Sequence, residues 1–416
     1  MVNIEKHILA NGLTVLVHQD NSTPLAAVNL LYNVGSRDEI PEKTGFAHLF
    51  EHLMFSGSVN IPSYDTVVQL VGGENNAWTN SDYTNYYITL PAQNIETAFW
   101  LESDRMLELN FSQEKLDIQK NVVIEEYKQR YLNSPYGDIP LLTRPLAYKT
   151  HSYQWPTIGK DISHIEKATL DDVKSFFYKY YAPNNAVLSV AGNVKSVEIF
   201  KLAEKWFGDI PKRDVPIRKL AQEPERTKQE VLTVERDVPT DMIVMNFHMD
   251  NRKSKGYYSS DLLSDILANG SSSRLYQNLF KKEKLFTTID AYISGNVEPG
   301  LFTVAGRLMS GVNMEKAENA IWNELESLQK EIVAEEELQK VKNKVEANLV
   351  FAEVSFLNKA VNMSQYEMIG DADDINKEAD NYRAISTSDI KEKAQNLFRK
   401  ENSTVLKYLS KNNIQK

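Results

Sequence analysis

Residues 44–57 read TGFAHLFEHLMFSG and are the most informative stretch of this chain. If the stretch is helical, five apolar side chains share one face, namely Phe46, Leu49, Phe50, Leu53 and Met54. At about 100° per residue, His48, Glu51 and His52 gather on the opposite face. We therefore predict a helix with a buried apolar back, an N-cap at Thr44 and a stop signal at Gly57.

The polar face of this helix has the spacing of a metal site. Two imidazoles at positions i and i+4 can converge on one cation, and the carboxylate beside the second can accept a proton from a water molecule there. The chain has no cysteine, so histidines and carboxylates must hold any metal. The alternative is a solvated polar face that binds nothing, but this five-residue pattern rarely arises by chance among 7 histidines in 416 residues. The sequence therefore favours a zinc site.

A third ligand is expected from the segment 112–127, because zinc hydrolases commonly use three protein ligands. On a helix that starts near Ser112, Glu126 lies within an inward apolar stripe made of Leu116, Val122 and Val123. Glu125 points about 100° away from it. A carboxylate in an apolar layer is costly unless it is paired or bound to a metal. Glu126 is therefore the ligand candidate and Glu125 an exposed charge; the alternative is an ion pair between Glu126 and a buried Lys or Arg.

The rest of the first half mixes strands with helices. Residues 13–18 and 26–32 are β-rich runs, and a strand at 186–192 follows a helix near 170–180. This order predicts an α+β fold.

The second half repeats the pattern of the first. The stretch 172–185 resembles 389–402, and the offset between these two stretches carries Leu13 to the edge of the strand pattern at 231–234. A proline-punctuated polar stretch lies between the halves. We predict homologous domains at 1–212 and 230–416 joined by a linker at 213–229. The alternative is that the two halves share an α+β order of strands and helices without common ancestry.

Composition excludes several classes of function. With 47 Lys+Arg against 57 Asp+Glu, the net charge of −10 argues against nucleic acid as the main partner. The absence of cysteine excludes disulfides and thiolate nucleophiles. No apolar run approaches the ~20 residues of a membrane helix, and the opening residues lack a signal-peptide profile. The expected compartment is cytoplasmic as the sequence is written, or periplasmic if a signal peptide was removed.

The motif resembles that of the pitrilysin/insulinase family of zinc metallopeptidases, the inverzincins, and in particular its short, processing-peptidase-like bacterial members. The family signature is His-x-x-Glu-His followed by a ligand Glu on a second helix further along the chain, and His48, Glu51, His52 and Glu126 match it. The resemblance implies one Zn²⁺ per chain on His48, His52 and Glu126, with Glu51 as general base. It also implies two homologous α+β domains, each an antiparallel or mixed sheet flanked by helices. Together they would form half of a clam-like chamber, with no metal motif in the C-terminal domain.

The resemblance also implies a place for the substrate. The segment Asn76-Ala77-Trp78-Thr79 matches an Asn-Ala-aromatic-Thr segment of the family that forms an edge strand, onto which a peptide adds through its backbone. Asn76, Ala77 and Trp78 would carry that role here. The alternative for Trp78 is a core aromatic with no contact to substrate.

Two departures from the family pattern affect the expected activity. Gln119 stands seven residues before Glu126, where the family usually has a Glu that supports the site through hydrogen bonds, and an amide cannot carry negative charge. Phe280 and Thr287 stand where active relatives have an Arg and a Tyr that grip the substrate. Arg274 and Tyr276 are nearby, but they belong to a turn shared with the family and are interpreted as structural.

These observations predict a zinc-dependent metalloendopeptidase that hydrolyses peptides within an enclosed chamber. The alternative is a non-catalytic or partner-dependent assembly subunit of the same fold. Because short members of the family divide the metal and the Arg/Tyr pair between subunits, the resemblance implies a dimer. The partner expected first is a zinc-less sister chain that supplies the pair, and a second copy of this chain is the other possibility.

Overall fold

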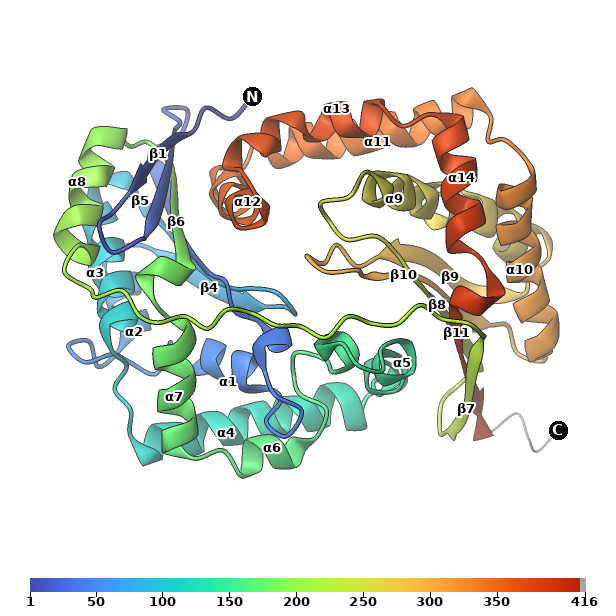
Figure 1. The fold of residues 1–416 in the computed structure, drawn as a ribbon, viewed down its shortest axis with the longest axis horizontal. Coiled ribbons are helices and arrows are strands. Elements are labelled where there is room, and N and C mark those ends of the chain that lie inside the picture. Colours follow the sequence, from blue (N-terminus) through green and yellow to red (C-terminus); the bar gives the residue numbers. More distant parts are fainter. Residues whose placement is uncertain (412–416) are drawn as a thin grey trace. The chain divides into compact units, whose positions relative to one another are not determined.

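The computed structural model describes residues 1–411, and their packing divides the chain into two compact units (Figure 1). The first unit comprises Met1–Gln129, Trp155–Leu220 and Leu349–Lys377. The second comprises Arg130–Gln154, Ala221–Asn348 and the residues from Glu378 onward. Each unit has one β-sheet flanked by helices, which confirms the predicted α+β class.

The first unit is built on a six-stranded sheet in the order β1-β2-β6-β3-β5-β4. Its strands are β1 (Glu5–Ile8), β2 (Thr14–Gln19), β3 (Leu25–Tyr32), β4 (Glu74–Thr79), β5 (Thr84–Pro91) and β6 (Ala186–Gly192). All neighbours are antiparallel except β2 and β6. The central strands β3 and β6 read as near-continuous apolar runs because both faces of the sheet are covered there. Strand β4 is an edge strand, as the sequence predicts.

Eight α-helices belong to the described part of the first unit. They are α1 (Phe46–Leu53), α2 (Tyr64–Leu70), α3 (Ile95–Leu107), α4 (Gln113–Tyr127), α6 (Ile162–Glu166), α7 (Leu170–Tyr180), α8 (Ser196–Phe207) and α12 (Phe356–Ile369). Helix α1 packs against α4, α7 and β4. The candidate metal ligands on α1 are therefore placed between a long helix and the sheet edge.

The second unit repeats the topology of the first. Its sheet order is β7-β11-β8-β10-β9, with strands β7 (Glu230–Arg236), β8 (Met242–His248), β9 (Phe286–Ile293), β10 (Leu301–Leu308) and β11 (Ser403–Ser410). This order matches β2-β6-β3-β5-β4, including the parallel pair, here β7 and β11. Strands β8 and β10 follow β3 and β5 at the same offset that relates 172–185 to 389–402. The repeat inferred from sequence therefore extends to strand order and spacing.

Helices of the second unit are α5 (Ile139–Ala147), α9 (Lys255–Ala268), α10 (Met314–Lys330), α11 (Glu335–Ala352), α13 (Glu378–Arg383) and α14 (Thr387–Leu397). Helix α11 spans the division between the units at its last residues. Helix α14 follows α7 at the repeat offset and has the same Ser/Thr-x-x-Asp capping box, which fixes both helix starts. No helix among residues 1–411 is both long enough and apolar enough to span a bilayer.

The two halves of the chain exchange one helix each. Helix α12, from the second half, packs on β3 and β6, whereas α5, from the first half, packs on β8 and β11 (Figure 1). The starts of the two helices are also related by the repeat offset, so the exchange is reciprocal. The compact units thus depart from chain order in these segments. The boundaries 1–212, 213–229 and 230–416 stay a prediction about the sequence repeat.

A buried polar network fastens α12 to the first sheet. The Asn29 side-chain amide donates to Ser364 Oγ at 3.0 Å, and Ser189 Oγ donates to the Ala360 carbonyl at 2.6 Å. Asn85 donates to Asn29 Oδ1 at 2.8 Å. Because unpaired polar groups in a core are costly, these matched partners specify where α12 lies on the sheet.

The linker is anchored by charged side chains at both ends. In the first unit, Arg213 donates to the Tyr181 carbonyl at 2.7 Å and Arg218 pairs with Asp38 at 2.5 Å. In the second unit, the carboxylate of Glu223 accepts three consecutive backbone N–H groups, those of residues 149–151. The segment therefore lacks regular structure but has defined contacts.

Candidate metal centre

Helix α1 has the two faces that its sequence predicts. Its five apolar side chains, Phe46, Leu49, Phe50, Leu53 and Met54, are at most 6% exposed. On the other face, His48, Glu51 and His52 are partly exposed. Burial of the apolar face holds the helix in one rotation, so the polar triplet has a fixed direction.

The predicted ends of α1 are wrong. The N-cap is Gly45, with φ of 88°, and the helix ends at Leu53, short of Gly57. A Cβ at residue 45 would lie 2.7 Å from the Ile158 carbonyl oxygen, so glycine is required by both conformation and space. The Oγ1 of Thr44 instead lies 2.9 Å from Nδ1 of His164, on helix α6.

The start of α1 is capped by a residue that the sequence analysis missed. The carboxylate of Glu39 accepts the backbone N–H groups of Gly45 and Ala47, both at 2.9 Å. These are donors that a helix start leaves unpaired, and the helix dipole favours an anion there. Burial raises the pKa of Glu39 well above its usual value, and the backbone donors act in the opposite direction. Rules that predict helix caps consider only residues close to the N-cap, so they do not identify Glu39.

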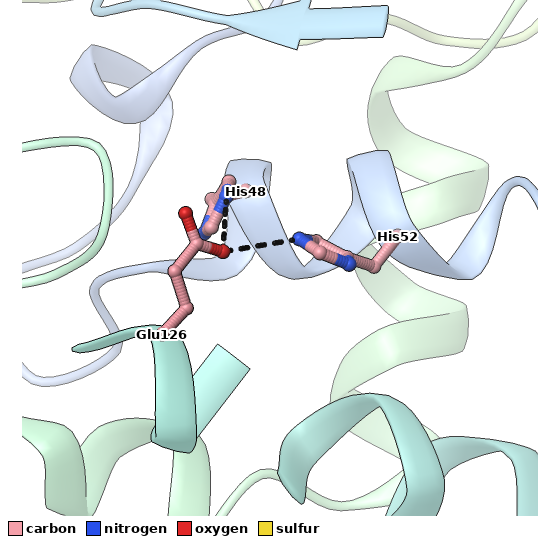
Figure 2. Close-up of side chains that lie close together, drawn as sticks. All are labelled: His48, His52 and Glu126. Atoms are coloured by element: carbon pink, nitrogen blue, oxygen red, sulfur yellow. Dashed lines mark ion pairs between the residues drawn. The ribbon is translucent and has the colours of Figure 1, made fainter. Parts of the chain in front are cut away.

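His48, His52 and Glu126 converge on one point (Figure 2). The Nε2 atoms of His48 and His52 each lie 3.5 Å from Glu126 Oε2, and the candidate ligand atoms are within 4.8 Å of one another. The imidazole rings are perpendicular, with centroids 4.9 Å apart. Two imidazole nitrogens and a carboxylate oxygen are the donor set of a catalytic zinc site, and such spacing leaves room for a cation among them. Within residues 1–411 no other His/Asp/Glu group of three or more has this arrangement.

Glu126 and its neighbour Glu125 point in different directions from helix α4, as the sequence predicts. The side chain of Glu126 is 20% exposed and faces α1, whereas that of Glu125 is 60% exposed and pairs with Lys128. The helix starts where the sequence predicts it, and Ser112 is its N-cap, accepting the N–H of Lys115. Val122, however, is 44% exposed, so its place in the inward stripe is wrong. The buried stripe of α4 consists of Leu116, Val123 and Tyr127.

Glu51 lies on the same helix face but contacts a different partner. Its Oε2 accepts the hydroxyl of Thr79, the last residue of edge strand β4, at 2.6 Å. Thr79 belongs to the edge-strand segment that the sequence indicates, but the sequence assigns it no role. Side chains alternate between the two faces of a strand, so the sequence does indicate that Thr79 lies on the same face as Ala77.

The other predicted residues are placed as follows. Asn76, Ala77 and Trp78 lie in β4, with Asn76 exposed and the other two half-buried. Gln119 is half-buried on α4, about two turns before Glu126. In the second unit, Phe280 stacks on Tyr276 with centroids 4.9 Å apart, and Thr287 lies on β9.

The turn containing Arg274 has a structural contact. The Arg274 guanidinium forms two hydrogen bonds to Glu337, at 3.0 and 2.8 Å. This pairing agrees with the structural interpretation of Arg274.

A buried ion pair packs against Phe55, which follows the metal-binding helix. Arg105 and Glu102 are at most 1% exposed and are joined by two hydrogen bonds, at 2.8 and 2.6 Å. The guanidinium lies 4.3 Å from the ring centroid of Tyr86 and 5.5 Å from that of Phe55, just beyond α1. Burial alone lowers the pKa of Arg105, but Glu102 holds that pKa above its usual value. The same burial raises the pKa of Tyr86, which keeps this hydroxyl neutral.

The repeat places a counterpart of the site, without the histidines, in the second unit. The repeat offset carries His48 and His52 to Asp265 and Asn269. Asn269 donates to the Asp265 carboxylate, and the Lys344 ammonium on α11 lies 3.9 Å from the same carboxylate. The carboxylate that stands in the first histidine's place thus accepts a hydrogen bond from an amide and lies beside an ammonium group.

Comparisons with known proteins agree with this asymmetry. Residues 14–135 match the family model described as "Insulinase (Peptidase family M16)", and residues 167–345 match "Peptidase M16 inactive domain". The zinc protease PqqE of Helicobacter pylori is 29% identical over 97% of this chain and 92% of its own length.

A solved structure and a distant relative extend the comparison. The crystal structure of a protease from Helicobacter pylori has a TM-score of 0.93 at 28% identity, covering 98% of this chain and 100% of that one. The mitochondrial-processing peptidase subunit beta of Saccharomyces cerevisiae is 27% identical over 50% of this chain and 45% of its own length. With its two repeated units and its His-x-x-Glu-His helix, the chain belongs to the pitrilysin/insulinase (M16) family of peptidases.

Proposed function

We propose that this protein is a zinc-dependent metalloendopeptidase that hydrolyses peptides within an enclosed chamber. The observation that carries the proposal is the convergence of His48, His52 and Glu126, with Glu51 on the same helix face and hydrogen-bonded to Thr79. The name "zinc protease" given to the relative from Helicobacter pylori supports the same chemistry.

The chain's residues divide the work between binding and proton transfer. His48, His52 and Glu126 would hold one Zn²⁺, which supplies Lewis acidity toward water and the scissile carbonyl. Glu51 accepts a proton from the attacking water and later donates it to the departing amine. The exposed edge of β4, with Asn76, Ala77 and Trp78, aligns the peptide backbone by strand addition. Gln119 supports Glu126 from the preceding turns of α4.

Metal removal tests this proposal directly. We expect the purified protein to contain one zinc per chain by elemental analysis and to cleave quenched fluorescent peptides. Treatment with a chelator should abolish cleavage, and stoichiometric Zn²⁺ should restore it. A protein that cleaves peptides equally well without metal would refute the proposal. One that binds zinc but cleaves nothing, alone or with a partner, would favour the assembly-subunit function.

We also propose that the enzyme works as a dimer, most simply with a zinc-less sister chain that supplies an Arg/Tyr pair. Phe280 is packed on Tyr276, and Thr287 offers only a hydroxyl, so neither can grip a substrate carbonyl as Arg and Tyr do. A relative named as a subunit of the mitochondrial processing peptidase supports a shared site.

The partner requirement predicts low activity for the isolated chain. Because orientation of the substrate contributes several orders of magnitude to rate, adding a sister chain should raise peptide cleavage by about a hundredfold or more. Light scattering of the mixture of the two chains should show a heterodimer. As a control, Phe280→Arg combined with Thr287→Tyr in this chain should partly replace the sister chain. A monomer that is already as active as every mixture would contradict the divided site.

A further inference from the structure

The contact between Glu51 and Thr79 joins two elements that the proposed reaction uses separately. Glu51 is on helix α1, and Thr79 ends the edge strand β4. The Thr79 hydroxyl donates to Glu51 Oε2 at 2.6 Å, the short distance typical of a hydroxyl on a carboxylate. Both residues are partly buried, so water competes only weakly for this bond.

The strand register shows why Thr79 reaches α1. Thr79 is paired with Thr84 on β5, and Ala77 with Tyr86, so these four side chains share one face of the sheet. Tyr86 on this face packs against Phe55, which follows α1. Trp78 is paired with Asn85, whose amide belongs to the network under α12 on the opposite face. The hydroxyl of residue 79 is thus aimed at the metal-binding helix by the strand itself.

We propose that Thr79 is a positioning residue for the general base. Its hydroxyl binds one oxygen of the Glu51 carboxylate and fixes the rotation of that group, so that the carboxylate is held ready to accept the proton of the attacking water. Because Thr79 lies directly after the predicted peptide-binding residues 76–78, the strand that aligns the substrate also orients the base. This inference rests on the proposed peptidase function, and it gives Thr79, the last residue of the edge-strand segment, a role that the predicted peptide-binding residues 76–78 do not have.

Removal of one hydroxyl tests the inference. Thr79→Val keeps the shape and β-propensity of the side chain but cannot donate a hydrogen bond. Loss of a hydrogen bond to a charged group should lower kcat by about tenfold to a hundredfold. KM should stay within about twofold and zinc affinity should be unchanged, because the hydroxyl is bonded to the base Glu51 and not to one of the proposed zinc ligands. Thr79→Ser, which restores the donor, should recover most of kcat.

Two controls separate the possible failures. Thr89→Val removes a half-buried hydroxyl from β5 in the same sheet and should leave kcat unchanged. If Thr79→Val has normal kcat while Glu51→Gln is inactive, the peptidase function stands and the positioning role is refuted. If Glu51→Gln is itself fully active, the proposed function fails. A Thr79→Ser variant as slow as Thr79→Val would show that the methyl group or strand packing matters, and this also refutes the role.

Discussion

Glu51→Gln should reduce peptide hydrolysis by about a thousandfold or more while the protein retains its zinc. Glutamine has nearly the same shape and can still accept the hydrogen bond of Thr79, but it cannot take a proton from water. The ligand atoms of His48, His52 and Glu126 are untouched by the change. Initial rates on a fluorescent peptide, together with elemental analysis of the same sample, measure both effects.

The two measurements have distinct meanings. Stoichiometric loss of zinc would make Glu51 a ligand and overturn the division of roles proposed for this helix. Zinc retained with a substantial residual rate would show that another group moves the proton. Glu42→Gln, an exposed substitution in the loop before α1, is the matched control and should change neither value.

Glu126→Ala should weaken zinc binding by more than about a hundredfold, whereas Glu125→Ala should change it by less than about threefold. Removal of a residue that only supports a ligand already costs about 10- to 100-fold in affinity, and Glu126 supplies one of three donor atoms. Glu125 is exposed and pairs only with Lys128 on the surface, where ion pairs contribute little.

Competition with a chromogenic chelator measures both affinities on one scale. Circular dichroism of the metal-free variants shows whether each is folded, so a loss of affinity can be assigned to the ligand. Equal effects of the two substitutions, or a larger effect of Glu125→Ala, would place the third ligand elsewhere on α4.

The parts of this protein that the sequence predicts are those with strong local periodicity. The apolar stripe of α1 and the inward place of Glu126 follow from a period of about 3.6 residues, and they need no knowledge of distant contacts. The helix at 170–180 has the same period, and the strand at 186–192 is a short apolar run that follows a turn signal, so both are found within one residue. The internal repeat then extends these predictions to the second half.

The predictions that failed depend on contacts far along the chain. Thr44 is a good N-cap by local rules, but Glu39 supplies the capping carboxylate and Gly45 the backbone conformation. Val122 is apolar yet exposed, because the face of α4 toward α1 is narrower than the apolar pattern suggests. Thr79 could not be assigned without the register between β4 and β5. No local sequence pattern indicates that α5 and α12 are exchanged between the two halves.

That exchange has a consequence for the order in which the protein can fold during synthesis. The sheet of the first unit has all its strands once Gly192 has left the ribosome, but the helix that covers β3 and β6 does not begin until Phe356. At about 5–20 residues per second, one sheet face waits on the order of ten seconds or more before α12 can cover it. During this time Asn29 and Ser189 lack their final partners. The contacts that complete the metal-binding half thus have a very large sequence separation, which slows folding. The face of the sheet that α12 covers is therefore exposed in the nascent chain until α12 has been made.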